Sequence, residues 1–108
     1  LRMLNAPSVE TQERAVRRLG TYAHTGRYTP RFFRSFVIPL HGLVAKGETE
    51  AVRLMAVSAL ASIGTDRAIK GLKNQVRTLH PERVRTVTEF AIAEYEAARP
   101  AVSRTLEP

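Results

Sequence analysis

Residues 48–76 read ETEAVRLMAVSALASIGTDRAIKGLKNQV, and this stretch decides the fold class. Its first part repeats apolar residues every three or four positions, which is the spacing of one face of an α-helix. These residues are Val52, Met55, Ala56, Ala59, Leu60 and Ile63. Gly64 then allows a left-handed stop, and Thr65 can cap a second helix whose apolar face continues to Val76. The stretch therefore predicts two amphipathic helices joined at one glycine, which is the unit of a helical solenoid.

Similar signals recur along the rest of the chain. A capping residue precedes each stretch of apolar residues at helical spacing, and glycine or proline follows it. The helices expected from them span about residues 8–24, 30–46, 48–63, 65–79 and 81–99. Pro39 lies inside the second of these and removes one backbone hydrogen bond, so we expect a kink or a short break near Ile38. Pro100 is expected to end the fifth helix, which leaves residues 100–108 as a disordered tail.

Internal repeats in the sequence distinguish a helical solenoid from a helix bundle. Five helices with short joints and no alternating strand pattern make an all-α array in either case. The segment Ala15-Val16-Arg17-Arg18-Leu19 aligns with Ala56-Val57-Ser58-Ala59-Leu60, and the pair Val84-Arg85 aligns with Val52-Arg53. Both spacings fall within the range of repeat lengths that is typical of stacked helical hairpins, so we expect a solenoid.

Residues 50–72 closely resemble a HEAT repeat, and the segment Val37–Val44 resembles the proline-containing second helix of another. The resemblance implies a short right-handed α-solenoid of about two and a half HEAT-like (PBS-lyase type) helical hairpins, forming a single domain over residues 1–99. The chain departs from the family pattern at Thr11-Gln12 and at Glu89. Terminal repeats are often atypical, and a longer parent array would fit the same departures.

The sequence lacks the residues or spacings that several kinds of catalytic, metal-binding and phosphate-binding site require. Without cysteine there is no disulfide, thiolate zinc site or cysteine nucleophile. The three histidines, His24, His41 and His80, are far apart in the chain and have no paired carboxylate near them. The glycines follow no strand and do not have the spacing of a phosphate-binding loop. We therefore expect a binding module with no enzyme activity, no cofactor and no metal.

The location of the protein is weakly constrained. No apolar run reaches the length of a membrane span, so we expect a soluble domain without membrane contact. The chain begins at Leu1 rather than at methionine, which favours a fragment or a processed form. The absence of cysteine is compatible with a reducing cytoplasm, which is the expected compartment.

The net charge of +7 is concentrated on two helices, those expected to be the second members of their hairpins. Residues 27–47 carry four basic side chains and no acidic one, and residues 65–80 carry four against a single aspartate. Helix surfaces without a binding role usually mix acidic and basic side chains, so this excess of basic side chains favours an anionic partner. In HEAT arrays the second helices line the concave surface, so the resemblance places these charges in the hollow. The residues expected to bind are Arg31, Arg34, His41 at the rim, Arg67, Lys70, Lys73 (or Asn74 in its place) and Arg77.

Two kinds of partner suit such a surface. The resemblance favours a protein, because HEAT arrays most often act as scaffolds, and the leading hypothesis is recognition of an acidic protein segment. Nucleic acid is the alternative, because HEAT-like DNA-repair glycosylases hold duplex DNA on a basic concave surface. Arginine outnumbers lysine 14 to 3, and its planar fork suits carboxylates and phosphates alike. Phe32, Phe33 and Phe36 would stack bases in the nucleic-acid hypothesis, although core packing is the simpler interpretation.

Overall fold

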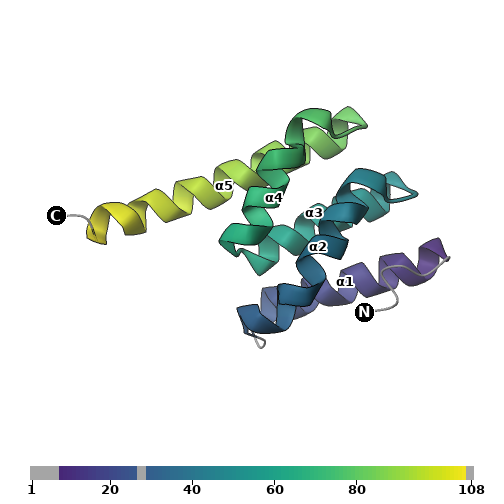
Figure 1. Ribbon diagram of the computed structural model, residues 1–108, viewed down its shortest axis with the longest axis horizontal. Coiled ribbons are helices and arrows are strands. Elements are labelled where there is room, and N and C mark those ends of the chain that lie inside the picture. Colours follow the sequence, from purple (N-terminus) through teal and green to yellow (C-terminus); the bar gives the residue numbers. More distant parts are fainter. Residues whose placement is uncertain (1–7, 27–28, 107–108) are drawn as a thin grey trace.

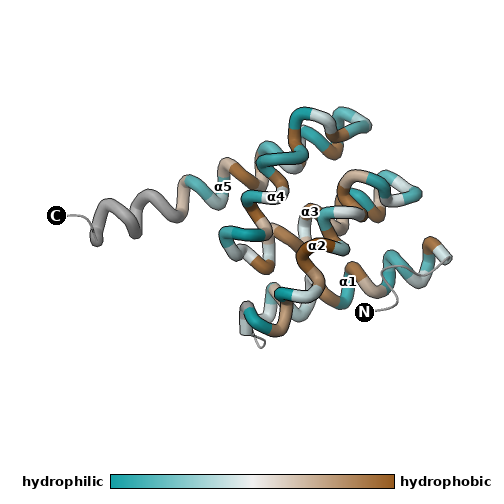
Figure 2. Tube along the Cα trace, in the orientation of Figure 1, coloured by the Kyte–Doolittle hydropathy of each residue, from teal (hydrophilic) through white to brown (hydrophobic). Residues whose placement is uncertain are grey.

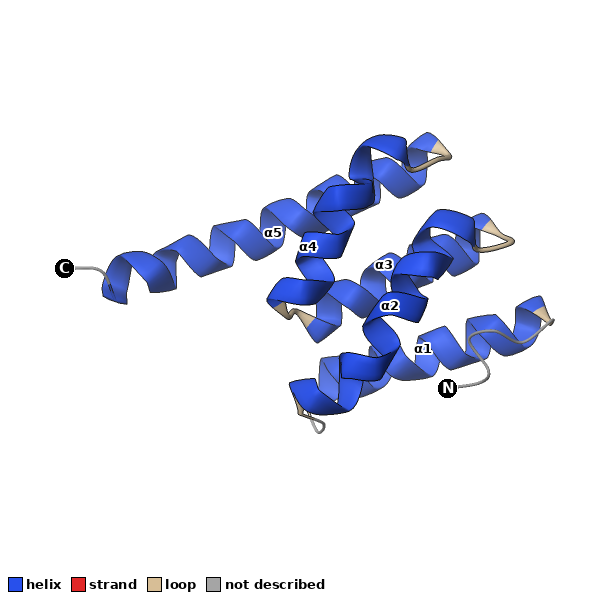
Figure 3. Cartoon of the chain, in the orientation of Figure 1, coloured by secondary structure: helices blue, strands red, loops and turns tan. Residues whose placement is uncertain are grey.

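The computed structural model describes residues 8–26 and 29–106 of the chain. In order, its elements are α1 Val9–Thr25, α2 Pro30–Lys46, α3 Glu50–Ile63, α4 Asp66–Gln75, the 3₁₀ turn η2 Val76–Thr78 and α5 Glu82–Leu106. These residues form no strand, which confirms the all-α prediction (Figure 3). When η2 is counted with α4, the predicted helix bounds agree closely with the observed ones everywhere except at the end of α5.

The helices lie in two layers. Figure 1 shows α1, α3 and α5 side by side in one layer and α2 and α4 in front of them. The Cα atoms extend over 52 × 31 × 17 Å, and the short third axis fits a slab two helices thick. Each helix of the front layer returns antiparallel to the helix before it, so the chain advances by hairpins (Figure 1). The predicted helical solenoid is confirmed. No helix in the described part of the chain is long and apolar enough to span a membrane.

Side-chain caps open four of the helices. The hydroxyl oxygens of Ser8, Thr29, Thr49 and Thr65 accept hydrogen bonds from the backbone N–H three residues later, at the starts of α1, α2, α3 and α4. Each cap satisfies one of the donors that a helix start leaves without a partner. Gly26 and Gly64 end α1 and α3 with φ angles of 69° and 63°, the left-handed region that L side chains avoid. The stops predicted at these two glycines are therefore confirmed.

The core lies between the two layers, and α3 is its centre because α3 contacts α1, α2, α4 and α5. Figure 2 shows hydrophobic segments gathered where α1, α2 and α3 meet. The largest fully buried apolar side chains are Leu19, Leu40, Leu60, Ile69, Leu72, Val16, Val44, Val52, Val57 and Val84. Thr88 is also fully buried, and its hydroxyl donates a hydrogen bond of 2.7 Å to the Val84 carbonyl one turn earlier. The apolar faces predicted for the helices therefore form one continuous core.

One prediction about proline was wrong. Helix α5 continues through Pro100 to Leu106, where a helix end was predicted. Helix α2 includes Pro39 without a break, which leaves the predicted kink, and Figure 1 shows α2 bending along its course. Proline removes only its own N–H, and its fixed φ is compatible with a helix. The carbonyls left without that donor belong to Ser35 and Glu96, which are both exposed, so water can satisfy them. Residues 107–108 of the predicted tail lie outside the described part of the chain.

Arg53 joins two successive inter-helix loops. Its Nε donates a 2.7 Å hydrogen bond to the Gly47 carbonyl, just after α2, and its Nη1 donates a 2.6 Å bond to the His80 carbonyl, just after η2. These two carbonyls occupy equivalent places at the ends of the two front-layer segments. A single guanidinium group therefore connects one hairpin to the next and holds the ends of α2 and of the α4–η2 segment in register.

Candidate functional site

All seven residues predicted to bind an anion belong to the front layer of the slab. Arg31, Arg34 and His41 lie on α2, Arg67, Lys70 and Lys73 lie on α4, and Arg77 lies on η2. Helices α2 and α4 are direct neighbours, so the sequence was right to treat these residues as belonging to adjacent elements. Their surroundings differ, however, and the predicted single basic row divides into separate groups.

Three of the arginines share one cleft at the N-terminal ends of α2 and α4. This arginine cleft has a volume of about 450 Å³ and is lined by Arg31, Arg34, Thr65 and Arg67. All three arginines are exposed, and none forms an ion pair with an acidic side chain of the described residues. Thr65, the N-cap of α4, is a lining residue that the sequence analysis assigned only a capping role. The sequence indicated this lining role only through the position of Thr65, two residues before Arg67.

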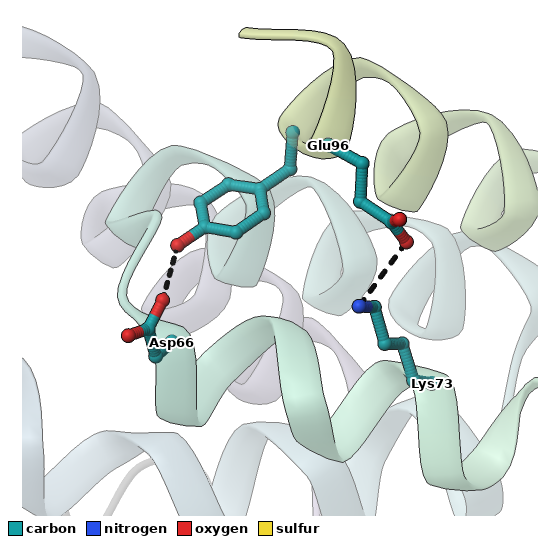
Figure 4. A network of polar contacts seen from close by, with 4 residues as sticks. Asp66, Lys73 and Glu96 are labelled. Carbon is teal, nitrogen blue, oxygen red and sulfur yellow. Dashed lines mark hydrogen bonds and ion pairs between the residues drawn. The ribbon is translucent and has the colours of Figure 1, made fainter. Parts of the chain in front are cut away.

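The acidic residue nearest to the cleft in sequence, Asp66, is directed away from it. Tyr95 of α5 donates a 2.5 Å hydrogen bond from its hydroxyl to the Asp66 carboxylate. Figure 4 shows the Asp66 side chain pointing toward α5. On a helix, residues 66 and 67 point about 100° apart, so a carboxylate bonded to α5 lies on a different side from the Arg67 side chain. The carboxylate of Asp66 is therefore held toward α5 and forms no ion pair with the three described arginines of the cleft.

Lys73 and Arg77 belong to a second group, which faces α5. The Lys73 ammonium lies 3.1 Å from the Glu96 carboxylate, and Figure 4 shows this ion pair bridging α4 and α5. Lys73 and Arg77 line a hollow of about 440 Å³ together with Glu89 and Glu96. Two basic and two acidic side chains balance each other there. Lys73 therefore lies apart from the arginine cleft, on the side of α4 that faces α5, an arrangement that the predicted single basic row did not include.

His41 is not at the rim of a basic surface, as predicted, but between α2 and α4. Its Nε2 lies 2.9 Å from the Ala68 carbonyl, and since a carbonyl only accepts, Nε2 carries the proton. The His41 carbonyl in turn accepts a 2.8 Å hydrogen bond from the Gln75 side-chain amide. Gly71 leaves the space that the ring fills, because a Cβ at this position would overlap the imidazole. His41 therefore sets how closely α2 and α4 approach, and so the width between the arginines on the two helices.

Replacing Gly71 with alanine is expected to destabilise the wild-type protein by about 1–2 kcal/mol, because the new methyl group displaces the His41 ring from its hydrogen bond. In a His41→Ala background the same replacement is expected to stabilise the protein by up to about 1 kcal/mol, because alanine favours a helix over glycine. Urea denaturation of the four proteins in this double-mutant cycle measures the change of sign. Equal effects of Gly71→Ala in the two backgrounds would contradict the proposed contact.

One apolar side chain lies among the basic ones on the outer surface of α2. Ile38 is 69% exposed, and it lies two helical turns after Arg31, on the same face. Lys70 is exposed on α4, one turn after Arg67. The outer surface of the front layer thus combines the arginine cleft, an exposed lysine and an exposed isoleucine.

The aromatic residues of α2 pack against one another. The ring of Phe32 meets those of Tyr22, Phe33 and Phe36 edge-on, at centroid distances of 6.5, 5.0 and 5.6 Å. Phe33 is buried, and Phe36 is half-buried. Edge-to-face contacts of this kind are a favourable arrangement for aromatic side chains in a core. The packing interpretation of this cluster is the better supported one, and Phe32 keeps 39% of its surface exposed.

The three histidines lie on different elements of the structure. His24, His41 and His80 lie on α1, on α2 and in the loop before α5. Across the described ranges, no three histidine or acidic side chains come together as a metal site.

Comparison with known protein families gives a match. A family model described as HEAT repeats matches residues 1–93. No curated protein and no solved structure matches the chain. The matched residues include α1 to α4, η2 and the first half of α5, and therefore all of the candidate binding residues discussed above.

Proposed function

The chain belongs to the HEAT-repeat family, and we propose that it is a non-catalytic module that binds an acidic segment of a protein partner on the outer surface of α2 and α4. HEAT repeats generally mediate scaffolding between proteins, and the family is generally non-catalytic. The finer statements, the acidic partner and the surface that receives it, rest on the charges and contacts described above.

The observation that carries the proposal is the arginine cleft. Arg31, Arg34 and Arg67 bring three positive charges to one cleft without an acidic partner among the described residues. Like charges held close together repel, and an idle surface would be expected to intersperse acidic residues between them. Other parts of the molecule do so, since Lys73, Arg83 and Arg85 each pair with a glutamate. An anionic partner would remove the repulsion that remains at the cleft.

Two features favour a protein segment over a nucleic acid. A phosphate backbone is bound best by a continuous basic track, and here Glu89 and Glu96 interrupt the track next to Lys73 and Arg77. The exposed Ile38 offers an apolar contact of the kind that protein interfaces use, and a phosphate backbone has no group to match it. The partner proposed is therefore an acidic peptide that also carries apolar side chains.

Fluorescence anisotropy with a labelled peptide rich in glutamate and containing one leucine tests this proposal. The Arg34→Glu, Arg67→Glu double variant is expected to bind the peptide at least about tenfold more weakly than the wild type. The matched control is Arg14→Glu, Arg18→Glu, which makes the same change of charge at two exposed arginines of α1, in the other layer. We expect the control variant to bind the peptide less than about threefold more weakly than the wild type. That loss of affinity is the part due to the change in net charge.

The same measurement with duplex and single-stranded DNA distinguishes the two partners. Binding through several phosphates would weaken steeply between about 50 and 200 mM salt on DNA of any sequence. Tighter binding of DNA than of the peptide, with that salt dependence, would replace the protein partner by a nucleic acid. If the two double variants lose the same affinity for the peptide, the peptide is attracted by net charge alone. That result would contradict binding at the α2–α4 surface.

A further inference from the structure

We propose that the arginine cleft receives a phosphorylated serine or threonine side chain within the acidic segment, so that phosphorylation of the partner controls binding. This inference rests on the proposed function and adds to it the chemical group that the cleft takes. Its support comes from the number of arginines, from the two helix ends that meet at the cleft and from the position of the exposed isoleucine.

The three guanidinium groups exceed what one carboxylate can neutralise. A carboxylate carries one charge and two oxygens, and a single bidentate arginine can occupy both oxygens. A phosphate monoester carries a charge of about −1.5 to −2 at neutral pH and three acceptor oxygens, so it can accept from several guanidinium groups at once. Arg31, Arg34 and Arg67 come from two different helices and converge on one cleft, which is the arrangement that a group with several oxygens requires. Lysine, which would offer only a point charge, is absent from the lining.

Two helix starts add to this positive field. Arg31 lies in the first turn of α2, and Thr65 and Arg67 lie at the cap and in the first turn of α4. The N–H groups at a helix start carry a partial positive charge that favours anions. The first turn of α2 contains no acidic residue, and in α4 the acidic residue of the first turn is bonded to Tyr95. Residues of both helix starts therefore line the cleft, and the first turn of α2 carries no carboxylate to offset its positive end.

The cleft also offers a hydroxyl donor. The Thr65 oxygen accepts the Ala68 N–H at 3.2 Å, and this leaves its own proton available to an acceptor. The cleft has about 450 Å³ of space and opens to solvent, which admits a phosphate group with its attached side chain. The three arginines and the threonine that line the cleft are therefore accessible to a peptide lying across α2 and α4.

The exposed Ile38 predicts a spacing within the partner. Two helical turns separate Arg31 from Ile38 along α2, which is about 10 Å of helix. An extended peptide covers this distance with about three residues. The partner is thus expected to carry an apolar residue about three positions from the phosphorylated one. Lys70, one turn after Arg67, is placed to contact an acidic residue between them.

The test uses three peptides that differ at one position only, occupied by serine, phosphoserine or glutamate, with flanking glutamates and a leucine three positions away. Isothermal titration calorimetry with the wild-type chain is expected to give at least about tenfold tighter binding for the phosphopeptide than for either other peptide. A gain of less than about twofold would overturn the inference. If the serine peptide still binds and the Arg34→Glu, Arg67→Glu variant weakens it, the proposed function stands without the phosphate site. If none of the three binds, the proposed function itself fails.

A conservative variant distinguishes specific recognition of the phosphate by arginine from a general attraction to positive charge. Arg34→Lys, Arg67→Lys keeps both charges but removes the planar forks, so the advantage of the phosphopeptide is expected to fall below about threefold while the affinity for the serine peptide stays within about twofold. These residues are exposed, and a circular-dichroism melt checks that the variant is folded. An unchanged phosphopeptide advantage in this variant would contradict the site.

A measurement on the unaltered protein provides a second readout. The side-chain Nε–H resonances of Arg31, Arg34 and Arg67 are expected to shift on addition of the phosphopeptide, and those of Arg14 and Arg18 to remain in place. Inorganic phosphate or duplex DNA that shifts the three cleft resonances at the same concentration as the phosphopeptide would overturn recognition of a peptide. A peptide-bound spectrum in which only resonances outside the cleft move would overturn the location.

Discussion

Replacing Leu60 with alanine is expected to lower the free energy of unfolding by about 2–5 kcal/mol. Leu60 is fully buried on α3, the helix that contacts all four of the others. The substitution removes buried methyl groups and leaves a cavity, and neighbours held from both layers of the slab have little freedom to fill it. Since domains of this size have a total stability of about 5–15 kcal/mol, the loss is a large fraction of the whole.

Urea denaturation followed by circular dichroism measures this loss, with Ser58→Ala as the matched control. Ser58 lies on the same helix and is exposed, so its replacement changes no core contact and is expected to stay within about 0.5 kcal/mol of the wild type. A Leu60→Ala protein that unfolds at the same urea concentration as the control would contradict the central position of α3 in the core.

Replacing Arg53 with alanine is expected to cost about 2–3 kcal/mol, which is the second largest effect among these predictions. The substitution removes two charge-assisted hydrogen bonds, to the carbonyls of Gly47 and His80. Gly47 is buried, so its carbonyl loses a partner that water does not readily replace. The connection between the two loops is lost at the same time, which frees the ends of α2 and η2 to move apart.

The control for Arg53 is Arg83→Ala. The Arg83 guanidinium lies 3.9 Å from the Glu50 carboxylate, and both side chains are exposed, at 72% and 41%. Solvent-exposed ion pairs of this kind contribute little, so we expect a loss below about 1 kcal/mol. Thermal melts of the two variants give the comparison, and a lower midpoint for Arg83→Ala than for Arg53→Ala would refute the structural role of Arg53.

The helices and their order could be predicted from the sequence because the signals are local. The apolar residues of α3 recur at helical spacing, Gly64 ends that helix at φ 63°, and the Thr65 hydroxyl caps the next. Each of these effects involves residues a few positions apart, so no knowledge of the tertiary structure was needed. The wrong prediction, a helix end at Pro100, concerns a residue whose effect depends on whether water can reach the freed carbonyl.

The arrangement of the candidate binding residues could be predicted only in part. Arg31, Arg34 and Arg67 were singled out correctly as lying on neighbouring helices, and the structure adds that they share one cleft with Thr65. Lys73 was assigned to the same basic row, yet it pairs with Glu96, which belongs to the following helix. The position of α5 along α4 decides this pairing, and no pattern within α4 carries that information.

His41 illustrates the same limit between α2 and α4. In the sequence it stands at a helix position close to two arginines, and its charge type suggested a place at the rim of the basic surface. In the structure it bonds to the Ala68 carbonyl and fills the space that Gly71 leaves open. These two partners lie on α4, beyond the whole of α3 in the chain, so their meeting with His41 depends on how closely α2 and α4 pack.

The sequence by itself determined that this chain is a row of capped amphipathic helices with its positive charge on the second helix of each hairpin. Hydrophobic periodicity and capping act over a few residues and leave a direct trace in the order of amino acids. Only the tertiary structure decided which basic side chains remain without an acidic partner, because this depends on which neighbour covers each side of a helix. Residues one position apart on a helix point about 100° apart, and the packing of α2 and α5 on the two sides of α4 leaves the arginine cleft open.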